Sequence, residues 1–262
     1  MKLNADFSKR AVVHAATLAW AASPVAGVER RMLDRIGDEV ARATSIVRYA
    51  PQSCFPPHVH GGGEEFLVLE GVFQDEDGDF PAGSYVRNPP QSRHTPRSAP
   101  GCTLFVKLWQ FDPADRTSVV VDTNNAALHA VEGRDGVRAL PLFRDAREEV
   151  RLEQWDSGAA IEVDPEGGLE VLVLTGGFSE SGDTFGTHSW LRLPIGAHFS
   201  ARAAADGCRV WIKEGHLRSV EGGQRRERGC AAARRTHALR RTAWAQRSAQ
   251  CALAPLPTLH SF

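Results

Sequence analysis

Short apolar runs, separated by turns rich in glycine and proline, recur along the chain and indicate β-strands. The clearest runs span residues 25–33, 41–49, 66–73, 84–87 and 102–111. The second of them is rich in β-branched and aromatic residues, which are frequent in strands. No stretch shows the sustained 3.6-residue period of a long amphipathic helix. Many short strands at close spacing predict an all-β protein built as a sandwich or barrel.

This pattern of strands occurs twice, which predicts a tandem duplication. Three segments of the first half return in the same order about 105 positions later: 66–73 as 171–178, 84–89 as 189–194, and 101–107 as 207–213. We therefore expect one domain at residues 1–115 and a second at residues 116–218, followed by a tail at residues 219–262.

The tail differs from the two repeats in charge. It holds eight arginines and two glutamates, a net charge of +6, whereas the whole chain has a formal net charge of −1. We expect this segment to be disordered or loosely helical. A basic arm can bind nucleic acid electrostatically. A solvated extension is the preferred interpretation, so no nucleic-acid partner is expected.

Cysteine usage and hydropathy indicate a cytoplasmic protein. The five cysteines are scattered and form no CxxC motif, which argues against a disulfide framework or a zinc ribbon. No apolar run is long enough to cross a membrane. The alanine-rich stretch at residues 11–22 has no convincing cleavage site after it and is assigned to the mature sequence.

A candidate metal site lies in the first repeat. His58 and His60 are two positions apart, so on a strand both imidazoles point to the same side. Glu64 and Glu65 follow after three glycines, and His94 lies further along the chain. Three imidazoles and a carboxylate are a plausible donor set for a divalent transition metal.

The second repeat lacks all four of these donors. At their positions it has Val163, Pro165, Leu169 and Phe199. The joint absence of all four candidate donors from the second repeat indicates that they share one role in the first. Glu65, by contrast, is kept in the second repeat as Glu170. This favours Glu64 as the carboxylate ligand. Glu65 is then either structural or a residue that supports the ligands from behind.

The same residues resemble the two sequence motifs of the cupin superfamily. His58, His60, Glu64 and Gly71 fit the first motif, and Gly83, Pro89 and His94 fit the second, in which Gln91 replaces an inner glycine. The amino-acid sequences of segments 41–45, 62–71 and 83–90 are similar to those of the ChrR-like cupins. These include the C-terminal domain of the zinc-dependent anti-sigma factor ChrR and some small non-haem dioxygenases. The resemblance covers residues 10–112 well and 120–217 more weakly.

This resemblance implies two tandem cupin barrels, each a double-stranded β-helix or jelly roll. It also implies that His58, His60, Glu64 and His94 are the metal ligands. ChrR-type anti-sigma factors carry an N-terminal helical domain with a His/Cys zinc cluster that grips the sigma factor. No such cluster precedes Cys54 here, so direct binding of a sigma factor is not expected.

Two functions remain open at this stage. Zinc is the favoured metal, with iron, manganese or nickel as alternatives, since imidazole suits all of them. Four protein ligands around Zn²⁺ leave no open position, which favours a regulatory, ligand-sensing role in a transcriptional stress response. Iron with expanded coordination would instead favour a dioxygenase acting on a small dicarbonyl or hydroxy-ketone.

No catalytic residue is assigned, and Glu65 and Tyr85 are the only candidates. Cupins commonly pair through sheet edges, so a homodimer is a further expectation.

Overall fold

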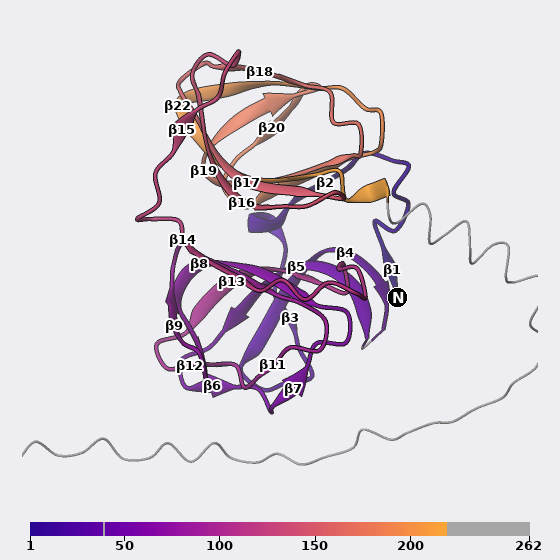
Figure 1. Cartoon of the computed structure of the whole chain (residues 1–262), viewed down its shortest axis with the longest axis vertical. Helices are drawn as coiled ribbons and strands as arrows, with labels where there is room; N and C mark the ends of the chain where they lie inside the picture. Colours follow the sequence, from indigo (N-terminus) through magenta and orange to yellow (C-terminus); the bar gives the residue numbers. More distant parts are fainter. Residues whose placement is uncertain (39, 219–262) are drawn as a thin grey trace, which may run out of the picture.

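Two β-barrels, one above the other in Figure 1, make up the part of the chain that this computed structural model describes, residues 1–38 and 40–218. In those residues an eleven-stranded and a two-stranded sheet build the first barrel, and a nine-stranded sheet builds the second. The prediction of an all-β chain with two tandem barrels is therefore confirmed. The expectation for the arginine-rich tail concerns residues 219–262, which lie outside the described residues.

The main sheet of the first barrel runs in the order β1-β4-β5-β13-β8-β10-β14, and all of its neighbouring strands are antiparallel. These strands are β1 (Lys2–Leu3), β4 (Val28–Gly37), β5 (Ala41–Tyr49), β8 (Glu64–Asp75), β10 (Ser84–Asn88), β13 (Cys102–Leu108) and β14 (Val119–Asp122). The shorter strands are β3 (Ala21–Ala22), β6 (Ser53–Cys54), β7 (His58–Val59), β9 (Gly78–Pro81), β11 (Arg93–His94) and β12 (Arg97–Ser98).

The second barrel follows the order β15-β16-β17-β22-β19-β21-β2, with β18 paired to β22 and β20 paired to β19. A 3₁₀ turn, η1 (Ala15–Thr17), follows β2. The strands are β2 (Ala11–His14), β15 (His129–Ala130), β16 (Val137–Arg144), β17 (Glu149–Trp155), β18 (Ala160–Val163), β19 (Leu169–Glu180), β20 (Asp183–Phe185), β21 (Ser189–Leu193) and β22 (Phe199–Glu214).

The observed strands follow the apolar pattern closely where both faces of a strand are covered. Strand β5 has the bounds expected from the sequence, and β8 extends the expected run 66–73 in both directions. The expected strand 102–111 is shorter in the structure. It ends at Leu108 because Trp109 turns the backbone into the left-handed region, with a φ of 59°.

The sequence repeat corresponds to a repeat in space. Gly71 and Gly176 occupy equivalent positions in β8 and β19, and both have a φ of 71°. A Cβ atom at either position would lie 2.1 Å from a carbonyl oxygen of the facing strand, so each repeat requires glycine there. The turn residues that recur in the sequence are thus fixed by the backbone of the barrel.

Two segments lie across the expected boundary near residue 115. Strand β2, from the N-terminal segment, pairs with β21 of the second barrel. Strand β14, which follows the boundary, pairs with β10 of the first barrel. Each barrel is therefore completed at one sheet edge by a segment from the other side of the boundary.

The face between the barrels is apolar and also holds buried ion pairs. One hydrophobic cluster combines Phe105 and Tyr85 of the first barrel with Trp211 and Trp190 of the second. Around it, charged side chains pair from one barrel to the other: Lys213 with Glu65 at 2.6 Å, Arg192 with Asp34 at 2.8 Å, Arg87 with Glu148 at 3.2 Å, and Lys107 with Glu170. The barrels thus share a core and are not independent of each other.

The Lys–Glu pairs of this face follow the internal repeat. Lys107 and Lys213 are equivalent positions, and so are Glu65 and Glu170. Each lysine binds the glutamate of the opposite barrel, which gives the interface an approximate two-fold relation. The recurrence of Glu65 as Glu170 is therefore explained by the contact between the barrels.

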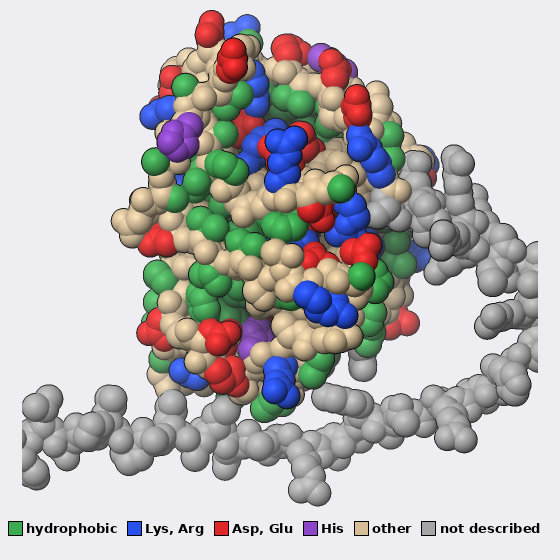
Figure 2. All heavy atoms as spheres, viewed as in Figure 1, with side chains coloured by type: hydrophobic (Ala, Val, Ile, Leu, Met, Phe, Trp, Pro, Cys, Tyr) green, Lys and Arg blue, Asp and Glu red, His purple; other side chains and the backbone are tan. Residues whose placement is uncertain are grey.

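Charged side chains of both signs are spread over both barrels on the face shown in Figure 2. They alternate with apolar side chains, and neither sign gathers over one barrel in that view. Within the described part of the chain, no helix has both the length and the apolar composition needed to cross a membrane.

Candidate metal centre

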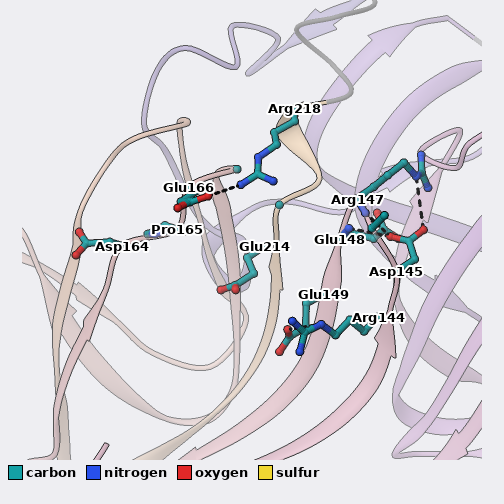
Figure 3. A pocket seen from close by; sticks show the side chains of 13 residues that line it. Arg144, Asp145, Arg147, Glu148, Glu149, Asp164, Pro165, Glu166, Glu214 and Arg218 are labelled. Carbon is teal, nitrogen blue, oxygen red and sulfur yellow. Dashed lines mark hydrogen bonds and ion pairs between the residues drawn. The ribbon is translucent and has the colours of Figure 1, made fainter. Parts of the chain in front are cut away.

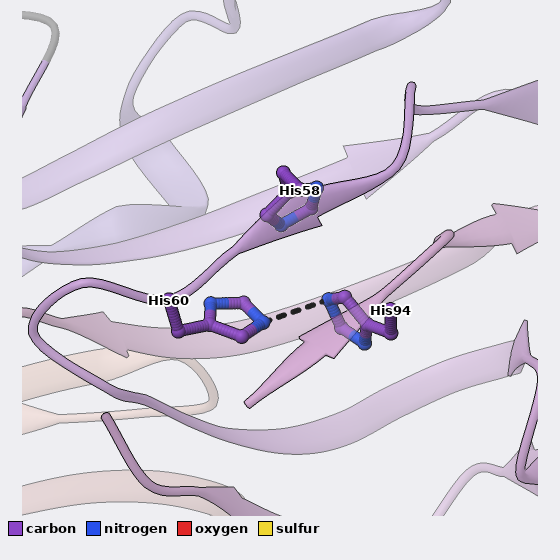
Figure 4. Close-up of side chains that lie close together, drawn as sticks. All are labelled: His58, His60 and His94. Carbon is purple, nitrogen blue, oxygen red and sulfur yellow. Dashed lines mark hydrogen bonds between the residues drawn. The ribbon is translucent and has the colours of Figure 1, made fainter. Parts of the chain in front are cut away.

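Two short antiparallel strands bring the three histidines together. His58 on β7 is the register partner of His94 on β11. His60 follows β7, and its backbone N–H donates to the carbonyl of Ser92 at 2.9 Å. Strands β7 and β11 lie at the end of the first barrel that is remote from the second barrel (Figure 1). The three imidazoles converge there, as Figure 4 shows.

Gln91 explains the departure from the second cupin motif. It stands where the motif has an inner glycine, and it adopts a left-handed φ of 75°. Its N–H donates to the carbonyl of His60 at 2.9 Å. Gln91 thus adopts a conformation that glycine reaches freely and that a non-glycine residue reaches at some steric cost.

The donor atoms of His60, His94 and Glu64 are close enough to one another to bind one metal ion. Nε2 of His60 and Nε2 of His94 are 3.0 Å apart, and Oε2 of Glu64 lies 3.5 Å from each of them. One ring nitrogen from each histidine falls within 4.8 Å of the others. Ligands bound to Zn²⁺ at about 2.0–2.1 Å in a tetrahedron are roughly 3.3 Å apart. The three histidines thus form a possible metal site, and Glu64 lies 3.5 Å from two of them, His60 and His94.

Hydrogen bonds behind the ligands fix which ring nitrogens face the centre. Nδ1 of His94 lies 3.0 Å from Oδ2 of Asp75, and Nδ1 of His58 lies 3.1 Å from the carbonyl oxygen of Pro56. With these nitrogens protonated, the Nε2 lone pairs are left for a metal. Asn88 donates to Oε2 of Glu64 at 3.3 Å, which also orients the carboxylate.

Asp75 is a hydrogen-bond partner of His94 that the sequence did not reveal. It lies at the end of β8, and its carboxylate is buried beside His94. In the sequence it belongs to a run of acidic residues before Gly78 that indicates only a hairpin turn. The second repeat gives no signal either, because Glu180, also acidic, stands at the equivalent position.

Burial and charge affect the two inner histidines in opposite directions. Burial lowers the pKa of His60, and the neighbouring His94 and His58 lower it further, while Glu64 opposes them. Burial also lowers the pKa of His94, but the hydrogen bond to Asp75 and the charge of Glu64 outweigh it, so the pKa of His94 is raised. His60 is therefore readily available as a neutral ligand, whereas a proton competes with a metal at His94.

Glu65 faces away from the histidines. It neighbours Glu64 on β8, and successive side chains on a strand point to opposite faces. Its carboxylate accepts hydrogen bonds from Tyr85 at 2.9 Å and from Lys213 of the second barrel at 2.6 Å. The supporting position expected for Glu65 behind the ligands is occupied by Asp75 instead, and Tyr85 lies on the interface with Glu65.

A cluster of three aromatic side chains, Tyr49, Phe55 and Phe73, packs against the histidines inside the barrel and is called the aromatic bed below. The ring of Phe73 is 5.8 Å from that of His94, and the ring of Phe55 is 6.1 Å from that of His58. Tyr49 packs against both phenylalanines, and burial, together with the charge of Glu64, raises its pKa well above the usual value. The inner side of the centre is thus apolar, and the half-buried His58 marks the side nearest to solvent.

A separate hollow of about 400 Å³ lies in the second barrel, away from the histidines. Its lining is charged, and several of its side chains already pair with each other (Figure 3). Arg218 binds Glu166 at 3.0 Å, and Arg147 lies 3.5 Å from Asp145. The hollow therefore offers no donor set comparable to the three histidines.

Comparison with known proteins agrees with this description of the first barrel. Residues 8–112 match the family model described as the ChrR Cupin-like domain. The first barrel is a ChrR cupin-like domain. Among curated proteins the sequence has no significant match.

Solved structures of the cupin fold superpose on both barrels together. A candidate dioxygenase from Nostoc punctiforme has a TM-score of 0.66 at 14% identity, covering 80% of this chain and 84% of that chain. The bacterial pirin YhhW from Escherichia coli, in complex with nickel(II), has a TM-score of 0.58 at 15% identity and covers 79% and 97%. Oxalate decarboxylase from Bacillus subtilis has a TM-score of 0.52 at 9% identity and covers 78% and 77%. At these identities the likeness shows the fold alone.

Proposed function

We propose that the first barrel binds a divalent transition metal through His58, His60, Glu64 and His94. We propose further that the chain is a bicupin that uses this centre to sense a small ligand in a transcriptional stress response. The observation that carries the proposal is the convergence of the three imidazoles, with the carboxylate of Glu64 3.5 Å from two of them. The hydrogen bonds of His94 Nδ1 to Asp75 and of His58 Nδ1 to the carbonyl of Pro56 support the same proposal.

The surroundings of the centre favour binding of a ligand over acid–base catalysis. Asp75 is engaged with His94, and the raised pKa of Tyr49 keeps its phenol protonated. A bound metal would supply an electrophilic centre for a small molecule with oxygen donors. The chain's own contribution would be to orient the ligand atoms, to exclude water on the aromatic side and to leave access on the side of His58.

Zinc is the metal we propose first, because four protein ligands match its tetrahedral preference. Nickel, iron and manganese remain alternatives, since imidazole binds all of them and the pirin structure holds nickel(II). A cytoplasmic location and a homodimer belong to the same proposal, whereas a sigma factor is not proposed as a partner.

A metal-dependent dioxygenase is the second candidate, and the likeness to the candidate dioxygenase from Nostoc punctiforme favours it. Such an enzyme would act on a small dicarbonyl or hydroxy-ketone, which can chelate a metal through two oxygen atoms. The aromatic bed below the histidines would suit the apolar part of that substrate.

Elemental analysis of the purified chain tests metal binding. His60→Ala removes a buried ligand, so we expect bound metal to fall from stoichiometric to background. Pro165→Ala changes the equivalent position of the second barrel and should leave the metal content unchanged. Equal metal in the wild-type chain and in His60→Ala would rule out the site.

Oxygen uptake separates the two candidate functions. The iron-loaded chain is mixed with a panel of β-diketones and hydroxyacetophenones, and dissolved oxygen is followed with an electrode. Ligand binding without uptake supports sensing, whereas uptake that is lost in His60→Ala supports the dioxygenase.

A further inference from the structure

Trp109 has an unusual backbone conformation beside the metal centre. It follows β13, has a left-handed φ of 59°, and is 47% exposed. Its ring lies close to the backbone of Gly61 and Gly62, between His60 and Glu64. A Cβ atom added at Gly62 would be 2.4 Å from the ring, and one added at Gly61 would be 2.9 Å from it. The lack of side chains in this loop is what allows the tryptophan to approach its backbone.

The loop beneath this ring joins two of the proposed ligands, His60 and Glu64. It is held from the same side by backbone hydrogen bonds: the N–H of Trp109 donates to the carbonyl of Gly63 at 3.1 Å, and the N–H of Phe111 donates to that of Gly62 at 3.4 Å. The ring of Phe111 covers Gly63 in turn. The segment after β13 therefore clamps the connection between a histidine ligand and the carboxylate ligand.

The second barrel shows the same position without the ring. Gly215 is equivalent to Trp109 in the repeat and also has a left-handed φ, of 86°. Glycine adopts this conformation without strain, whereas a residue with a bulky side chain adopts it at a steric cost. The strained residue thus occurs in the barrel that has the four metal donors, and the relaxed residue occurs in the barrel that lacks them. Strain of this kind is typical of functional sites.

We propose that Trp109 is a positioning residue for the metal centre, whose ring holds the Gly61–Gly63 loop so that His60 and Glu64 keep ligand spacing. The proposal rests on metal binding by the first barrel. Trp109 is not one of the proposed ligands and acts through the backbone of the loop. Removing the ring frees the loop, and the cost appears in metal affinity.

The test measures Zn²⁺ affinity by competition with a chromophoric chelator. Trp109→Asn removes the ring while keeping a residue that tolerates the left-handed conformation, and Trp109→Gly copies the second barrel. We expect both to weaken Zn²⁺ binding on the order of tenfold, as is typical for residues that orient ligands. Trp109→Phe keeps a ring over the glycines and should retain most of the affinity. Trp20→Asn, which removes a ring that contacts Arg31 and Arg48 instead, should leave the affinity unchanged.

Hydrogen exchange on the metal-free chain gives a second readout. Loss of the ring should speed exchange of the loop amides between His60 and Glu64, while the thermal unfolding midpoint of the metal-free chain changes little. Wild-type Zn²⁺ affinity in both Trp109→Asn and Trp109→Gly would contradict the positioning role of Trp109 but not the proposed metal site. A wild-type chain that binds no metal overturns the proposed metal site and the clamp together.

A double-mutant cycle with Gly62 tests the contact directly. The backbone of Gly62 is not left-handed, and the three atoms nearest to a Cβ added there all belong to the ring of Trp109. Gly62→Ala should weaken Zn²⁺ binding in the wild-type chain and have little further effect in Trp109→Asn. Additive effects of the two substitutions would contradict the proposed contact.

Discussion

The two barrels share one scaffold but differ in what lies at equivalent positions. In the first barrel His58 faces His94 across β7 and β11, and in the second Val163 faces Phe199 across β18 and β22. Phe199 and Leu169, the counterpart of Glu64, are buried in the core of the second barrel. The same backbone therefore supports either a polar centre or an apolar core, and the side chains decide which.

The comparison also explains why the residues shared by the barrels are not at the metal centre. Lys107 and Lys213 each cross to a glutamate of the other barrel, and this exchange needs the same residues in both copies. The shared residues hold the barrels together, whereas the four candidate metal donors occur in only one of them. The predictions below test this division of roles, from the largest expected effect to the smallest.

The largest effect is expected from placing a ligand residue in the apolar barrel. Leu169→Glu buries a carboxylate among apolar side chains with no partner, so it should lower the free energy of unfolding by about 3–5 kcal/mol or abolish folding. The reciprocal change, Glu64→Leu, removes a carboxylate from the first barrel and should alter metal-free stability by less than about 1.5 kcal/mol. Urea denaturation of metal-free chains measures both. Similar costs for the two substitutions would show that the barrels do not differ in this way.

Lys213→Met should be nearly as destabilising, because it leaves Glu65 buried without the cation that it binds and leaves Glu148 with Arg87 alone. Removing one partner of a buried ion pair typically costs about 3–5 kcal/mol. Arg138→Met breaks the exposed pair with Asp156 and should cost about 1 kcal/mol or less. Chemical denaturation of both variants measures the loss of unfolding free energy. A loss for Lys213→Met no larger than that for Arg138→Met would contradict the stabilising role assigned to the buried ion pairs between the barrels.

Stability should also fall in acid because of the same interface. Burial alone would raise the pKa of Glu148, but the positive charges of Lys213 and Arg87 lower it from 4.5 to about 2. A carboxyl group with a lowered pKa stabilises the fold above its unfolded pKa, and this contribution is lost as the pH falls through the folded pKa. We therefore expect the free energy of unfolding of the metal-free chain to decline between pH 4.5 and about pH 2.

Glu148→Gln is the control for this pH dependence. It removes the titrating group, so its unfolding free energy should change less over the same pH range than that of the wild-type chain. Thermal unfolding at several pH values provides the measurement. Parallel curves for the two chains would show that Glu148 does not contribute.

The smallest effect is expected at the residue behind a ligand. Asp75→Asn weakens the hydrogen bond that orients His94, so Zn²⁺ affinity should fall on the order of 10-fold to 100-fold. Asp79→Asn alters an exposed aspartate on the neighbouring strand β9 and should have no effect. Competition titration with a chelator measures both affinities. Equal affinities in the two variants would remove Asp75 from the centre.

Much of the fold, and the three histidines that the structure brings together, could be predicted from the chain alone. The apolar runs are strands because turns bound them and both of their faces are covered, and β5 was predicted to the residue. The donors could be predicted because His58, His60 and Glu64 are close in sequence, and the second repeat shows the same scaffold without them. The role of Asp75 could not be predicted, since an acidic residue in a turn gives the same sequence pattern whether or not the folded chain places a histidine beside it.

The sequence by itself determined the two repeats, their strands and the chemical identity of the donors, because those depend on residue type and local spacing. Only the tertiary structure decided which side chains meet. It paired β2 and β14 across the expected boundary, turned Glu65 towards Lys213, and laid Trp109 on the glycine loop. These contacts join residues that are distant in sequence, and only close packing in the folded chain specifies them.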